Sequence, residues 1–237
     1  MTAWRASMPP SRRSSVSARR PEMPYRALLC FLALAAAGTA SAEDGRLSKA
    51  RDMILSLYPE SCDADLATDF AGLENVAYDV SWQEKDWDGA PIKREGTLFE
   101  VNCYLAAYNI VVAYVFAPDE DAAEAMLPVS FAVPAFTLDY ADDDTDQTRL
   151  AAPPAVTGFS AETLLVNPSF DPETNTITSF AKWRGLGDAY SSGAWALENG
   201  RFVLKHFVID PIYEANVEDP SEELIETNFV LYDADAY

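Results

Sequence analysis

Histidine is almost absent from the sequence, since His206 is the only one in 237 residues. A Ser-His-Asp triad would have to use this residue. His206 follows the alternation of Phe202, Leu204 and Val208, which places it on the apolar face of a predicted strand, near its edge. The pattern therefore predicts a packed histidine and not a general base.

Cysteine is also scarce, with Cys30, Cys62 and Cys103 as the three in the chain. In an oxidising compartment Cys62 and Cys103 predict one disulfide, and the alternative is two buried free thiols. A bridge closing a loop of about 40 residues is worth roughly 3–4 kcal/mol in the chain-entropy model. With both cysteines committed, no thiol nucleophile or thiolate metal site is left.

No hydrophobic run is long enough to span a membrane. The longest apolar stretch of the N-terminus, Ala27–Ala37, is well short of the roughly 20 residues that a bilayer requires. It follows basic residues that include Arg26 and precedes the small residues Ala40-Ser41-Ala42, which is the order of parts in a secretory signal peptide. Residues 1–42 are therefore predicted to be a cleaved leader with a functional start at Met23, and the released protein is predicted to be periplasmic or extracellular.

Basic residues are few, with 17 against 38 acidic ones. The first 42 residues hold six Arg and one Glu, so residues 43–237 keep 11 basic and 37 acidic side chains, a net charge of −26. Such a surface repels nucleic acid and anionic lipid head groups. It would attract a cationic protein or an envelope component as partner, or divalent cations, but the favoured interpretation is that the acidic surface keeps an exported protein soluble.

The apolar pattern predicts an α+β fold. Leu47–Tyr58 has helical spacing and Pro59 ends it, whereas strand-like alternation runs from residue 74 onward. We expect one N-terminal helix and a mainly antiparallel, meandering β-sheet that closes into a sandwich or a barrel. The expected organisation is a helix plus β half over 43–138, a loop over 139–158 and a C-terminal β half over 159–237, packed as one domain.

The predicted loop is acidic and rich in proline. It contains Asp142, Asp143, Asp144 and Asp146, followed by Pro153-Pro154. Carboxylates can bind Ca²⁺, but such loops need alternating ligands and a Gly that sharpens the turn, and this Gly is absent. A solvated loop is therefore the favoured interpretation.

Asn199-Gly200 is the strongest turn signal in the chain, because a type I′ turn needs positive φ at both central residues. A two-residue loop there pairs Leu197 with Phe202 and Trp195 with Leu204. All four side chains then share one apolar face.

The C-terminal half resembles a known family across residues 164–209. The positions that carry the resemblance are Asn167-Pro168-Ser169-Phe170-Asp171, Phe180-Ala181-Lys182-Trp183-Arg184-Gly185-Leu186-Gly187-Asp188, Trp195 and Gly200-Arg201-Phe202, with a weaker match at Cys103 and Ala107-Tyr108-Asn109. They are similar to the exported proteobacterial family catalogued as domain of unknown function eleven seventy-six. The resemblance implies a second disulfide in relatives, whose cysteines are replaced here by Ala189 and by a cysteine-free stretch around 210–216. It implies no activity.

The run Arg184-Gly185-Leu186-Gly187-Asp188, with the nearby Trp195, is the candidate motif loop. Its glycines can cradle an anion through backbone N–H groups. The favoured alternative is a tight connection in which Gly185 and Gly187 take positive φ while Arg184 and Asp188 pair across it. It is not a dinucleotide-binding fingerprint, because the third Gly and the following helix are missing.

The sequence singles out no catalytic, cofactor-binding or metal-binding residue. The leading hypothesis is an exported, non-enzymatic binding or envelope-associated protein. One alternative is an inhibitor of a cationic exported hydrolase such as lysozyme, acting by electrostatic complementarity. The other is a carboxylate-based or calcium-dependent enzyme acting on envelope polymers, although no carboxylate pair stands out among so many.

Overall fold

The computed structural model describes residues 36–63, 73–119, 125–213 and 227–236. The chain divides into two units, Met1–Ala40 and Ser41–Tyr237, and the second contains the fold. Residues 1–35 of the predicted leader, with Met23 and Cys30, lie outside the described residues, and residues 36–42 form the start of a helix. The leader stays a prediction.

Helix α1 (Ala36–Leu57) includes the helix expected from the apolar spacing and ends before Pro59. Ala50 and Ile54 are buried on its apolar side. They belong to a cluster with alternate residues of two strands, among them Val101 and Val115. The helix is therefore fixed by burying one stripe against a sheet, as expected for an amphipathic segment.

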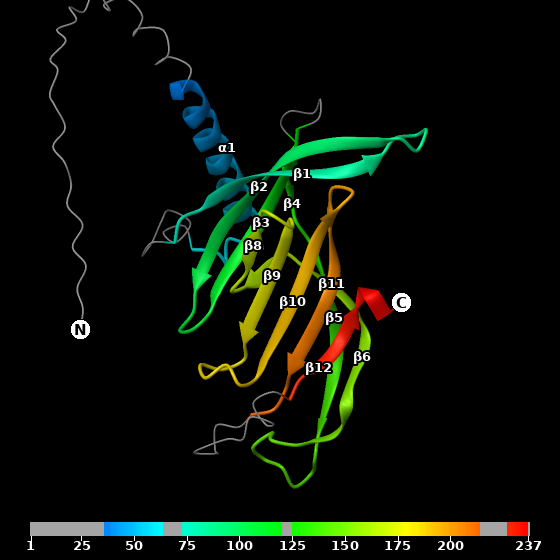
Figure 1. The fold of residues 1–237 in the computed structure, drawn as a ribbon. Helices are drawn as coiled ribbons and strands as arrows, with labels where there is room; N and C mark the ends of the chain where they lie inside the picture. The colour runs from blue at the N-terminus through cyan, green and yellow to red at the C-terminus, as the bar shows by residue number, and fades with distance from the viewer. Residues whose placement is uncertain (1–35, 64–72, 120–124, 214–226, 237) are drawn as a thin grey trace, which may run out of the picture. The chain divides into compact units, whose positions relative to one another are not determined.

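The strands form three antiparallel sheets (Figure 1). The first, in the order β1-β2-β3-β4 with β7 also paired to β3, consists of β1 (Val76–Lys85), β2 (Pro91–Leu105), β3 (Ile110–Pro118), β4 (Leu127–Pro128) and β7 (Leu164–Val166). The second, in the order β12-β11-β10-β9-β8, consists of β8 (Ser169–Asp171), β9 (Thr176–Lys182), β10 (Tyr190–Glu198), β11 (Arg201–Asp210) and β12 (Phe229–Asp233). The third is a two-stranded ribbon of β5 (Phe131–Tyr140) and β6 (Leu150–Glu162). A 3₁₀ turn, Ala234–Ala236, follows β12.

The core lies between the first two sheets, with α1 on the outer side of the first. Residues 111–117 of β3 are all buried because both of its faces are covered. Val111, Ala113 and Val115 face the helix cluster, whereas Val112 and Tyr114 face a cluster shared with the second sheet. The α+β prediction is confirmed, and of its two alternatives the barrel is wrong, since the described strands do not close.

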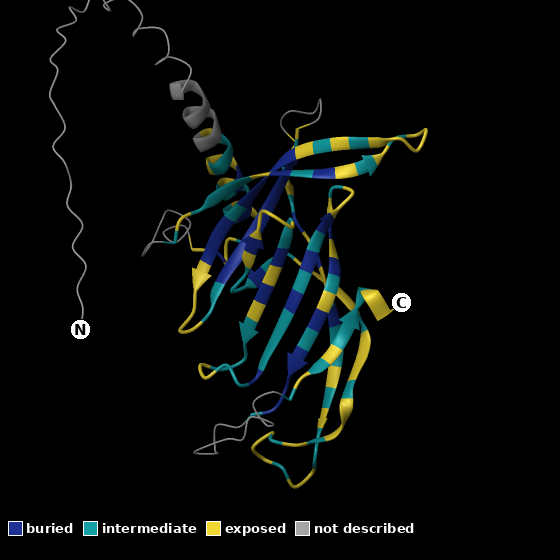
Figure 2. Ribbon diagram, viewed as in Figure 1, coloured by how far each residue is buried: buried dark blue, intermediate teal, exposed yellow. Residues whose placement is uncertain are grey.

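The predicted loop over 139–158 is wrong for most of its length. Only residues 141–149 connect strands, and Pro153-Pro154 lie within β6. The register shifts between Thr137 and Asp139 of β5, where Leu138 alone lies opposite both prolines, so β6 has a bulge at this point. Proline is tolerated there because β6 pairs with β5 alone among the described strands, and β6 itself is largely exposed (Figure 2).

The hairpin predicted at Asn199-Gly200 is confirmed. Both residues have positive φ, 48° and 73°, as a type I′ turn requires. Leu197 pairs with Phe202 and Trp195 with Leu204, and these four side chains are buried. The turn chemistry therefore determined the register correctly.

The same hairpin overturns the prediction for His206. The register shifts between Ala194 and Trp195, so that Ala194 pairs with His206 instead of Lys205. This bulge reverses the alternation and turns the next residue, Phe207, into the core. His206 is exposed, not packed on the apolar face.

Candidate functional site

The candidate motif loop joins β9 to β10 at one end of the second sheet. Arg184, Gly185, Gly187 and Asp188 lie in this loop, but Trp195 does not join them. Trp195 is 0% exposed in the core, where its Nε1 donates a hydrogen bond to the carbonyl of Ala132 at 2.9 Å. The five residues therefore form a loop and a separate core anchor, not one site.

Arg184 and Asp188 make a bidentate ion pair across the base of the loop, as predicted. Arg184 Nε donates to Asp188 Oδ1 at 2.7 Å, and its terminal nitrogen donates to Oδ2. The guanidinium also lies 4.7 Å from the centre of the Tyr213 ring. Two parallel hydrogen bonds and a stacked ring fix the orientation of a guanidinium strongly, so the pair holds the loop in shape.

The two glycines serve different purposes. Gly187 has positive φ (75°) and closes a turn by donating its N–H to the carbonyl of Arg184 at 3.0 Å. Gly185 does not have positive φ, so that part of the prediction is wrong. A Cβ at Gly185 would lie 3.3 Å from the ring of Tyr108, so glycine is needed there for close approach. Between them Leu186 is 73% exposed.

The turn between β2 and β3 packs against this loop. Tyr108 donates its hydroxyl to the carbonyl of Trp183 at 3.4 Å, and Asn109 Nδ2 donates to the carbonyl of Lys182 at 2.9 Å. These partners are 73–75 residues apart in the sequence. The Ala107-Tyr108-Asn109 element and the motif loop therefore form one structural unit.

Asn167 links the same unit to the first sheet. Its Nδ2 donates to Asn109 Oδ1 at 2.8 Å and to the carbonyl of Phe180 at 2.9 Å. Its Oδ1 accepts the N–H of Ile110 at 2.7 Å. Asn167 has a φ of 44°, a left-handed conformation that asparagine tolerates better than most residues. One amide thus satisfies polar groups of three segments.

The motif loop, the Ala107-Tyr108-Asn109 turn and Asn167 all lie within the range of a known protein family. Residues 33–212 match the family described as "Protein of unknown function (DUF1176)". The chain belongs to this family. No curated protein and no solved structure matches it.

The resemblance implies a second disulfide in DUF1176 relatives, with one cysteine at the position of Ala189. In this chain Ala189 is packed in the interior. Ala189 is fully buried, and its carbonyl accepts the N–H of Trp183 at 2.9 Å. The next residue, Tyr190, pairs with Asp210, after which come the buried Pro211 and Ile212. The cysteine-free stretch therefore runs beside Ala189.

Asp210 is a member of this DUF1176 site that the sequence did not indicate. It is 0% exposed; Oδ1 accepts the N–H of Ile212 at 3.0 Å, and Oδ2 has no hydrogen-bond partner within the part of the chain that the structure describes. Burial, aided by the nearby Asp188 carboxylate, raises its pKa to about 6, against the lowering effect of the Ile212 N–H. The sequence does not indicate that Asp210 is buried, because an Asp at the end of a strand usually lies in a solvent-exposed turn.

Asp210→Asn is expected to change how stability depends on pH. Between pH 4 and 6 the folded wild type holds a proton that the unfolded chain has released, so its free energy of unfolding falls as pH rises through this window. The variant should lack this fall and be more stable than wild type above pH 6 by about 1–3 kcal/mol. Urea unfolding at pH 4–8 measures it. Asp142→Asn, an exposed control, should match wild type, and an equal effect of Asp210→Asn at pH 4 and pH 8 would contradict the assignment.

A second carboxylate with a raised pKa, the partly buried Glu100, lies between the two sheets. Glu100 Oε2 accepts hydrogen bonds from the hydroxyls of Tyr114 at 3.1 Å and Tyr78 at 3.4 Å. Burial raises the pKa of Glu100, while the two hydroxyls act in the opposite direction. The tyrosines satisfy this carboxylate within the core, which gives it a structural role in joining β1, β2 and β3.

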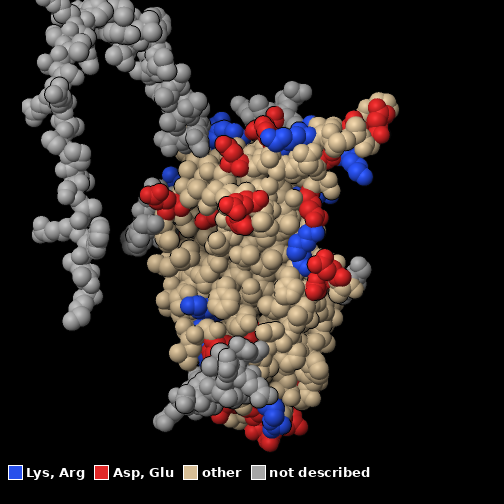
Figure 3. Space-filling model, viewed as in Figure 1, with Lys and Arg blue, Asp and Glu red and all other residues tan. Residues whose placement is uncertain are grey.

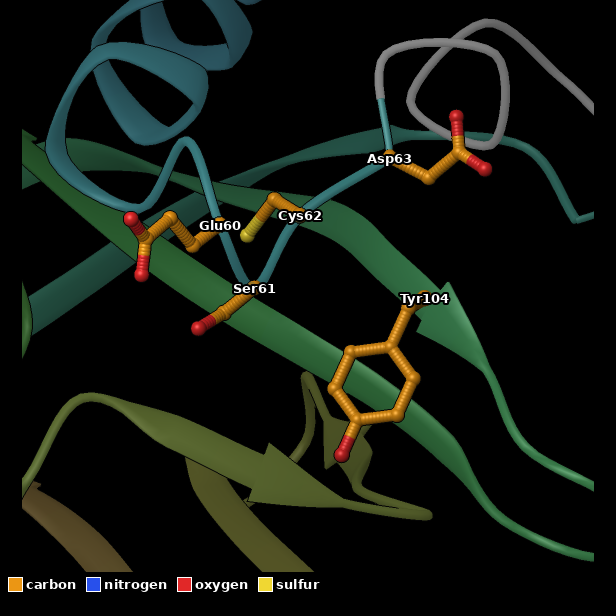
Figure 4. A pocket seen from close by; sticks show the side chains of 5 residues that line it. All are labelled: Glu60, Ser61, Cys62, Asp63 and Tyr104. Carbon is orange, nitrogen blue, oxygen red and sulfur yellow. The ribbon is translucent and has the colours of Figure 1, made fainter.

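A surface pocket of about 460 Å³ lies beside the disulfide (Figure 4). Cys62 and Cys103 are bridged, as predicted, and Cys62 lines the pocket with Glu60, Ser61, Asp63 and Tyr104. The carboxylates of Glu60 and Asp63 point away from each other in Figure 4. They therefore do not converge on one point.

The described ranges contain neither a membrane-spanning helix nor a metal-binding cluster. No helix there is both long and apolar enough to cross a bilayer. No three His, Cys, Asp or Glu side chains within those ranges are grouped so as to hold a metal ion. Asp144 of the acidic loop instead accepts the backbone N–H of Arg149 at 2.6 Å and shapes the turn.

Proposed function

We propose that the protein is an exported, non-enzymatic binding protein whose partner is cationic. The main observation in support is that the charged residues of the motif loop pair with each other. Arg184 and Asp188 are bound to one another and hold the loop, while Leu186 projects from it. Such a loop suits recognition better than proton transfer, since a catalytic acid or base must reach a substrate.

The choice of partner rests on charge. Residues 43–237 have a net charge of −26, which attracts cationic proteins and accelerates their association. In Figure 3 charged side chains lie mainly around the margin of the visible face, and its centre over β9–β11 is largely uncharged. A partner with basic groups around an uncharged contact would complement such a surface.

Export is supported by two features. The N-terminal 42 residues have the order of parts of a signal peptide. The Cys62–Cys103 bridge is compatible with an oxidising compartment. Within the envelope, the proposed partner is a cationic protein. The most specific version of the proposal is that this protein inhibits a cationic hydrolase such as lysozyme.

Titration with lysozyme tests the proposal. We expect binding at about 10 mM salt that weakens by at least about tenfold at 150 mM, since the Debye length falls from about 30 to about 8 Å. Isothermal calorimetry measures it, and a neutral protein of the same size is the control. No binding at low ionic strength would reject the proposal.

The rival function is a carboxylate-based enzyme acting on envelope polymers. It is favoured by the raised pKa values of Asp210 and Glu100. Turnover of peptidoglycan by wild type, lost in Asp210→Asn or Glu100→Gln without a fall in melting temperature, would replace the binding proposal with this one.

A further inference from the structure

Four exposed large side chains lie on the β2–β3 end and the motif loop. We define the loop-end patch as Tyr104, Leu105, Tyr108 and Leu186, all of which are exposed. The contact of Tyr108 with Gly185 joins its two segments. Exposed apolar side chains that gather in one place mark interaction sites, whereas single ones need no explanation.

The patch is held rigidly at its most exposed residue. Leu186 is 73% exposed, yet its loop is fixed by the Arg184–Asp188 pair, the turn at Gly187 and the hydroxyl of Tyr108. An apolar side chain on a fixed loop requires no ordering of the backbone on binding, so more of its burial energy is kept as affinity. Residues of this kind act as anchors that fill a pocket in the partner.

Charge next to the patch is acidic on the side of Tyr104. Glu60 and Asp63 line the pocket that Tyr104 also lines (Figure 4). On the other side Arg184 is neutralised by Asp188 and the Lys182 side chain lies close to Gly187, so the carboxylate margin is confined to the Tyr104 side. An apolar centre with a carboxylate margin complements an apolar cleft edged by Lys or Arg, whereas anionic lipid would be repelled.

We propose that Leu186 is the anchor by which this protein docks into an apolar cleft of a cationic globular protein, with Tyr108 packed at the edge of the cleft. This inference rests on the proposed binding function and names the surface that performs it. Glu60 and Asp63 face the basic margin of the cleft and strengthen the attachment at low salt.

The test compares Leu186→Ala with Leu127→Ala in the full chain, using lysozyme as the probe. Leu127, on β4, is a matched control because it is a leucine that is 61% exposed outside the patch. We expect Leu186→Ala to raise the Kd at least about tenfold and Leu127→Ala to leave it unchanged, both without loss of melting temperature. Glu60→Gln/Asp63→Asn should leave the contact in place and reduce its salt dependence.

The outcomes separate the two proposals. Equal affinities of Leu186→Ala and wild type for lysozyme would overturn the anchor and leave the binding function standing. Absence of wild-type binding at low ionic strength would overturn both. Binding to vesicles of anionic phospholipid that depends on Leu186 would also overturn the anchor, because its occupant would then be lipid.

Discussion

Trp195→Ala should lower the free energy of unfolding by about 3–5 kcal/mol. The indole is 0% exposed, and its ring centre lies 5.3 Å from that of Phe131 and 6.4 Å from that of Phe207. A Cβ on Gly193 would overlap the same ring, which shows how closely the backbone approaches it. Truncation therefore leaves a cavity at the centre of the shared core.

Urea unfolding followed by circular dichroism measures this loss. Trp87→Ala is the matched control, because Trp87 is 92% exposed and its removal should change stability by less than about 0.5 kcal/mol. Equal losses in the two variants would contradict the placement of Trp195. The result also distinguishes Trp195 from the motif loop, because substitution of a binding residue should weaken partner binding more than it lowers the free energy of unfolding.

Replacing Cys62 and Cys103 by Ala should cost about 4 kcal/mol, the chain-entropy value for the 41-residue separation that the bridge closes. The bridge ties the segment after α1 to β2, where Asp63 also donates its N–H to the carbonyl of Cys103 at 2.7 Å. Without the bridge the unfolded chain has more conformational entropy, and folding must overcome this additional entropy.

Thermal unfolding of wild type with and without reductant provides the comparison for this variant. Reduced wild type should approach the stability of the double variant, and reductant should not affect the variant itself. Thiol titration of the native full chain should detect at most Cys30. Two reactive thiols beyond Cys30 would show that the bridge does not form in solution.

Local signals predicted local structure well. Asn199-Gly200 indicated its hairpin and register because a type I′ turn depends on two residues alone. The alternation after it failed at His206, since a bulge inserts one residue and β11 itself contains no Gly to mark it. Pro153-Pro154 were read as a loop because the tolerance of an edge strand for proline depends on which neighbours it lacks.

The site was predictable only in part. Pairing of Arg184 with Asp188 follows from their spacing in a tight loop, and it was expected. The contact of Tyr108 with Gly185 joins segments more than 70 residues apart, which no periodicity can indicate. Asp210 was missed for the same reason: its burial depends on how the chain after β11 turns beside Ala189 and not on neighbouring residues.

The two prolines of β6 affect how copies of this protein meet in a crowded solution. β6 pairs with β5 alone among the described strands, so its other edge offers backbone groups on which a foreign strand can assemble. Pro153 and Pro154 lack N–H groups, so this stretch of β6 offers fewer donors to such a strand. The protein thereby carries its own protection against edge-to-edge aggregation at a long exposed ribbon.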